Sequence, residues 1–121
     1  MKNFKNLDIW ETGMQIVEKT YKLTHLINEN EKSGLIKQLK RAAVSIPSNI
    51  AAGASRDSAK ENYYFLQIAL GSLFQLETQF ILTRRLKLLD TYLVDEAIEL
   101  ITEERKIMYA YMKKLTMRAV K

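Results

Sequence analysis

Residues that interrupt regular backbone structure are scarce in this chain, and this scarcity constrains its fold more than any other feature. The 121 residues include only four glycines and one proline. A β-sandwich or β-barrel needs a turn roughly every 8–12 residues, and such turns are rich in glycine and proline. The chain is therefore expected to form long elements of secondary structure with few turns between them, and we expect these elements to be helices. The length predicts one domain over residues 1–121.

Apolar residues with helical spacing predict four long helices separated by polar breaks near 28–30, 53–57 and 90. The first helix is expected to begin at Asp8. The others are expected over about 33–54, 58–87 and 92–117. Because the connections are short, consecutive helices should be antiparallel neighbours. The sequence therefore predicts an all-α fold, an antiparallel up-down-up-down four-helix bundle.

Local signals mark several helix ends. Asp8 with Glu11, and Ser58 with Glu61, have the form of a capping box, in which a polar side chain caps the helix. Pro47 lies inside the second predicted helix, where it removes one backbone hydrogen bond. The apolar pattern resumes after Pro47, so we expect a kink, with a break into two helices as the alternative. A turn is expected at 53–57, which begins with a glycine.

The third predicted helix is apolar on almost every side between residues 65 and 82. Each helix of a monomeric bundle keeps one face in water, so this helix is expected to be covered by another subunit. Gly71 lies in its middle, where glycine costs about 1 kcal/mol relative to alanine. We expect Gly71 to allow a neighbouring helix to approach closely.

Composition and charge exclude several classes of function and limit the kinds of partner that we expect. The absence of cysteine excludes a disulfide scaffold, a cysteine zinc site and a thiol nucleophile, and it is compatible with the cytoplasm. No signal sequence and no run of about 18 apolar residues is visible, so no membrane partner is expected. The net charge of +5 permits an anionic partner without requiring one.

Residue types that carry catalysis are sparse. The sole histidine, His25, is expected at the surface or at a helix cap, and no serine has an obvious histidine partner. Glu96, Glu99 and Glu103 share a helix face, but a di-iron bundle also needs Glu-x-x-His on two helices. A solvated charged face is therefore favoured. The sequence predicts no enzyme, no catalytic residue, no metal and no cofactor.

Polar residues within the second and third helices are expected to face one another when the chain folds at residues 55–57. The members of this polar seam are Arg41, Ser45, Asn49, Ser72 and Glu77. We interpret the seam as a structural network, including an Arg–Glu pair, that fixes helix register. A ligand site or a subunit contact is the alternative.

A motif over these two helices resembles a known family. The residues that carry it are Gly34-Leu35, Gln38, Arg41-Ala42-Ala43, Ser45-Ile46-Pro47, Asn49-Ile50-Ala51, Gly53, Ala69, Gly71-Ser72-Leu73 and Glu77, with Phe4, Leu7 and Trp10 before them. They resemble the 23S rRNA intervening-sequence proteins, or S23 family. The resemblance implies a four-helix bundle that assembles as a homopentamer, and a related branch of the family contacts nucleic acid. The family signature has an acid where this chain has Ala52, so no role of that acid carries over.

One end of the predicted bundle gathers basic residues, because the first and third helices start there and the second and fourth end there. Four acids lie at this end, at positions 8, 11, 57 and 61, whereas the charges at the other end balance. The basic residues are Lys2, Lys5, Arg56, Lys60, Lys113, Lys114, Arg118 and Lys121. In a pentamer they would form a ring of about +20, which attracts phosphates without reading sequence.

We therefore expect an accessory protein that binds RNA, DNA or a ribonucleoprotein through this basic end. The alternative is a protein–protein interaction scaffold without nucleic-acid binding, on which the basic residues only keep the surface soluble.

Overall fold

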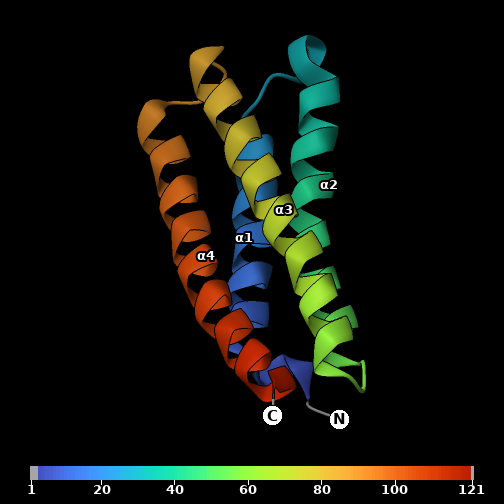
Figure 1. Cartoon of the computed structure of the whole chain (residues 1–121). Helices are drawn as coiled ribbons and strands as arrows, with labels where there is room; N and C mark the ends of the chain where they lie inside the picture. Colours follow the sequence, from blue (N-terminus) through green and yellow to red (C-terminus); the bar gives the residue numbers. More distant parts are fainter. Residues whose placement is uncertain (1–2, 121) are drawn as a thin grey trace.

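A computed structural model describes the backbone of residues 3–120 and the side chains of residues 3–28 and 34–117. The described chain is all-α and contains no strand. Its elements are η1 (Phe4–Asn6), α1 (Asp8–Thr24), α2 (Glu29–Ala54), α3 (Ala59–Arg85) and α4 (Thr91–Val120). The four α-helices run up and down alternately, and both termini lie at the same end as the α2–α3 connection (Figure 1). The predicted four-helix bundle is confirmed.

The core lies along the axis of the bundle, where the apolar stripes of the helices meet. α1 packs on α2 and α4, and α3 packs on the same two helices. Each stripe follows the helical spacing of the sequence, because residues three or four apart share one helix face. Fully buried members of the core are Ile9, Ile16, Leu39, Ile46, Leu66, Leu73, Phe80, Ile101 and Met108.

Of the two predicted capping boxes, the side-chain cap of the one at Ser58 is confirmed. The Ser58 hydroxyl accepts a hydrogen bond of 2.9 Å from the backbone N–H of Glu61, and α3 begins at Ala59, directly after Ser58. The other prediction is wrong, because α1 is capped by Leu7, whose side chain offers no hydrogen bond. Asp8 is already helical, since η1 turns the chain and partly buried Leu7 packs against the core.

α2 begins at Glu29, earlier than expected, and runs through Pro47 without ending, so the alternative of two separate helices is wrong. Gly53 lies inside α2 and not in a turn. α3 ends at Arg85, before the expected residue 87, because Lys87 adopts a left-handed conformation with φ of 58°. Such a residue commonly terminates a helix.

The close helix approach predicted at Gly71 is found at Gly53 instead. A Cβ atom at Gly53 would lie 2.6 Å from Asn62 Oδ1 and 3.0 Å from Phe65 Cβ. Only glycine therefore lets the last turn of α2 lie this close to α3. Gly71 is exposed, and a Cβ atom there would meet nothing within 4 Å, so within the described chain this prediction is wrong.

α3 carries an apolar face that the other helices leave uncovered. Its exposed large side chains are Tyr64, Ile68, Phe74 and Leu82. Among the described helices, α3 alone is long and apolar enough to cross a membrane by length and composition, a property that core helices of soluble proteins share.

Candidate nucleic-acid interface

The predicted basic residues lie on three segments that meet at one end of the bundle. These are the chain before α1, the α2–α3 connection together with the first turn of α3, and the last turns of α4 (Figure 1). Among the described side chains, Lys5, Arg56, Lys60, Lys113 and Lys114 are all exposed there. The side chains of Lys2, Arg118 and Lys121 lie outside the described residues.

Two of these cations are positioned by aromatic rings. The Arg56 guanidinium carbon lies 4.7 Å from the centroid of the Phe65 ring. Lys5 Nζ lies 6.0 Å from the centroid of Phe4, which in turn contacts Trp10 edge to face at 5.4 Å. Cation–π contacts at exposed sites contribute about 0.5–1 kcal/mol each, so they bias the positions of both charges without removing them from water.

Two open hollows lie beside these cations. The first, of about 620 Å³, is lined by Arg56, Lys60, Glu61, Tyr64 and Phe65. The second, of about 470 Å³, lies where the first turn of α3 meets the end of α4, and Lys60 also lines it. The basic end therefore combines exposed positive charge with recesses that have mostly apolar walls.

The predicted polar seam is formed in part. The Asn49 side-chain amide donates to the Ser45 carbonyl oxygen at 2.8 Å and to the Ser45 hydroxyl at 2.9 Å. The hydroxyls of Ser45 and Ser72 share a hydrogen bond of 2.8 Å across the α2–α3 interface. Ser72 is buried and the other two are partly buried, so this chain of hydrogen bonds links the two helices in a fixed register.

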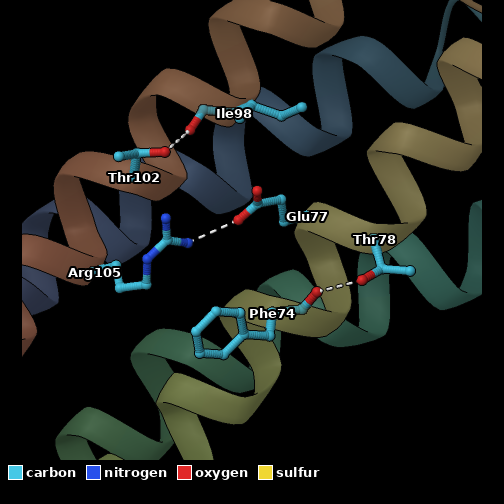
Figure 2. Close-up of polar contacts among 6 residues, drawn as sticks. All are labelled: Phe74, Glu77, Thr78, Ile98, Thr102 and Arg105. Atoms are coloured by element: carbon cyan, nitrogen blue, oxygen red, sulfur yellow. Dashed lines mark hydrogen bonds and ion pairs between the residues drawn. The ribbon is translucent and has the colours of Figure 1, made fainter.

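The prediction that Arg41 and Glu77 form an ion pair in this seam is wrong. Glu77 accepts a hydrogen bond of 2.7 Å from Arg105 Nη1, so its partner lies on α4 and not on α2. Figure 2 shows Arg105 reaching from α4 towards α3, and its guanidinium carbon lies 5.2 Å from the centroid of Phe74. Arg41 is exposed on the outer side of α2, and no ion pair involves it in the part of the chain that is described.

Glu104 is an unusual feature that sequence reasoning missed. Its side chain lies inside the bundle with 0% exposure, and neither carboxyl oxygen has a hydrogen-bond partner. Burial, assisted by the charge of Glu103, raises the pKa of Glu104 from 4.5 to about 8. Gly13 on α1 makes room for the carboxyl, because a Cβ atom there would lie 3.2 Å from Glu104 Oε2.

The helical spacing between Glu104 and its apolar neighbours in the sequence indicates that its side chain is buried. Glu104 follows Ile101 by three residues and precedes Met108 by four, and both neighbours are fully buried. Helical periodicity therefore places the carboxyl on the buried stripe of α4. The surrounding run of charged residues, 103–106, conceals this position because it has the composition of a solvated face.

The remaining candidates for chemistry are distributed over the surface. His25 is exposed and caps the end of α1. Glu96 pairs with Lys19 at 2.9 Å, whereas Glu99 and Glu103 are exposed. Within the described residues no group of acidic or histidine side chains has the arrangement of a metal site.

Comparison with known proteins gives a family and a fold. A family model described as "23S rRNA-intervening sequence protein" matches residues 5–110. No curated protein sequence matches the chain. A crystal structure from Bacteroides thetaiotaomicron, of a protein with unknown function from the S23 ribosomal protein family, has a TM-score of 0.80 at 20% identity, covering 87% of this chain and 98% of that one. That likeness shows the shared fold, and the family model covers most of the chain. The chain therefore belongs to the family of 23S rRNA-intervening sequence proteins.

Proposed function

We propose that this protein is a non-enzymatic accessory factor that contacts nucleic acid or a ribonucleoprotein through its basic end. The proposal is carried by the basic residues of this end. The sequence predicts eight basic and four acidic residues there and balanced charges at the other end. Among the side chains that the structure describes, Lys5, Arg56, Lys60, Lys113 and Lys114 are exposed at this end. The family's name, which refers to 23S rRNA, is consistent with a nucleic-acid context.

The mode of contact is neutralisation of backbone phosphates. Lys113 and Lys114 are exposed on α4, and the chain contains no acid after Glu104. Lysines in such a setting attract phosphates and release counterions, so affinity falls as salt rises. Phosphate contacts position a partner without reading its sequence, so we expect binding with little sequence preference.

The salt dependence of binding tests this proposal. The double variant Lys113→Ala/Lys114→Ala should weaken RNA or DNA binding at low salt. For a single strand, it should reduce the slope of log K against log salt by about 1.4 for two lost contacts. The matched control is Lys22→Ala/Lys37→Ala, which removes two exposed lysines near the opposite end. Absence of binding at low salt, or an unchanged slope in the double variant, would overturn the proposal.

We further propose that the protein assembles with copies of itself through the part of the exposed apolar face of α3 that lies between Ile68 and Leu82 and does not include Tyr64. Ile68, Phe74 and Leu82 are exposed on one helix, each by less than half of its surface. Fully burying an exposed side chain of this size contributes about 1.5–3 kcal/mol, so covering the remaining surface of each contributes about half of that or less. The number of five copies rests on the family resemblance alone. Ile68→Lys should reduce the mass measured by light scattering, whereas Leu26→Lys, at an exposed position near the end of α1, should not. A monomeric native protein would contradict the assembly.

The same apolar face supports a second candidate function, a protein-interaction scaffold that needs no nucleic acid. A stoichiometric protein partner that survives nuclease treatment and is lost in Ile68→Lys would favour this candidate. Loss of the partner after nuclease treatment would favour the nucleic-acid function.

A further inference from the structure

The hollow beside the α2–α3 connection has an exposed aromatic wall. Tyr64, in the second turn of α3, is 60% exposed although it is a large aromatic side chain. Arg56, Lys60 and Glu61 line the same hollow of about 620 Å³. An aromatic face in water next to two cations is a combination that the packing of the bundle does not require.

Phe65 holds two side chains that line this hollow in place. Its ring contacts the ring of Tyr64 edge to face, with centroids 5.6 Å apart, and it also lies 4.7 Å from the Arg56 guanidinium carbon. Phe65 is partly buried against the last turn of α2 at Gly53. One anchored ring therefore positions both an exposed phenol ring and a guanidinium at the rim of the hollow.

We propose that this hollow binds an unpaired nucleobase of a single-stranded nucleic acid. The base stacks on Tyr64, and the phosphates beside it lie against Arg56 and Lys60. Every nucleobase has a π face, so stacking on an aromatic side chain tolerates sequence, while a duplex keeps its base faces covered. The inference rests on the proposed nucleic-acid function and specifies which form of nucleic acid the basic end takes.

Glu61 adds a preference among bases. Its carboxylate repels phosphate, but it accepts hydrogen bonds from the exocyclic amino group of cytosine or adenine. Thymine and uracil present only the ring N3–H, which lies between two carbonyl oxygens that repel a carboxylate. The hollow should therefore favour strands of cytosine over strands of thymine.

Binding of fluorescent oligonucleotides tests the site. Probes are oligo(dC), oligo(dT) and a blunt duplex of equal length, measured by anisotropy at low salt. Tyr64→Leu should weaken single-strand binding by about 5- to 150-fold, the range for one lost stacking contact, and leave duplex binding unchanged. Tyr64→Phe should retain affinity because it keeps the ring. Tyr92→Leu is the matched control, since Tyr92 is 63% exposed at the opposite end of the bundle.

The outcomes separate this site from the proposed function. Unchanged single-strand affinity in Tyr64→Leu, with weakened binding in Lys113→Ala/Lys114→Ala, overturns the stacking site and leaves the basic end in place. No binding of any probe by the native protein overturns both. A changed oligomeric mass in Tyr64→Leu overturns the site as well, because it assigns Tyr64 to a subunit interface. Equal affinity for oligo(dC) and oligo(dT) removes Glu61 from the base contact.

Discussion

The buried carboxyl of Glu104 makes the stability of this protein dependent on pH in an unusual direction. Its pKa is about 8 in the folded chain and close to 4.5 when unfolded, so the folded state binds the proton more tightly. The free energy of unfolding is therefore highest at low pH, as far as this group is concerned. It falls by about 1.4 kcal/mol per pH unit between the two pKa values.

The expected magnitude follows from these two values. At neutral pH, Glu104 is ionised in the unfolded chain but stays neutral in the folded chain, and this difference lowers the free energy of unfolding. The loss relative to the fully protonated group is about 3 kcal/mol at pH 7 and about 4 kcal/mol at pH 8. Glu104→Gln removes the titration but keeps the shape and the buried polar group. This variant should therefore be more stable than the native protein by nearly these amounts.

Urea unfolding followed by circular dichroism, at fixed protein concentration and between about pH 5 and pH 8, measures the difference directly. The advantage of Glu104→Gln should grow steadily over this range. Glu99→Gln, an exposed position on the same helix, is the control and should follow the native protein. A difference between Glu104→Gln and the native protein that stays constant with pH would refute the reasoning. The carboxyl would then be hydrated or partnered in the folded state.

Substitutions at three further positions test the local structure, each by urea or thermal unfolding. Gly53→Ala should lose about 1–3 kcal/mol, because its Cβ atom would lie 2.6 Å from Asn62 Oδ1 and something must shift; unchanged stability would contradict the close approach. Gly71→Ala should gain about 1 kcal/mol, since alanine favours a helix interior and the new atom meets nothing within 4 Å. A loss would indicate that a second copy approaches Gly71. Ser58→Ala should lose about 1 kcal/mol with the cap of α3, whereas Ser58→Asp should restore it.

Features that depend on neighbouring residues in the chain could be predicted from the sequence. The bundle follows from apolar spacing and short connections, and the cap at Ser58 is set by a residue three positions away. The same pattern failed at Asp8, because the capping position is decided by how η1 and Leu7 pack against the core. A local motif competes there with a tertiary contact, and the tertiary contact prevails.

Which side chains interact across the helix interfaces could be predicted only in part. Ser45 and Ser72 meet because short side chains follow the helix register, and that prediction is confirmed. Arg41 and Glu77 do not pair, because Arg105 from a third helix reaches the carboxylate. Which of several arginines reaches a given acid depends on the spacing and rotation of the helices, and these are not local properties of the sequence.

The order in which the helices pack has a consequence for folding kinetics. Three of the four helix interfaces join consecutive helices, and only the α1–α4 interface joins elements from opposite ends of the chain. Because closing this long loop costs more chain entropy than forming the three hairpins, we expect the α1–α4 interface to form last. Glu104 on α4 lies against Gly13 on α1, so its carboxyl leaves water when this last interface closes. We therefore expect a rise in pH to act mainly by speeding the separation of α4 from α1. Once the base catalysis of exchange itself is corrected for, amide protection in these two helices should fall before it does in α2 and α3.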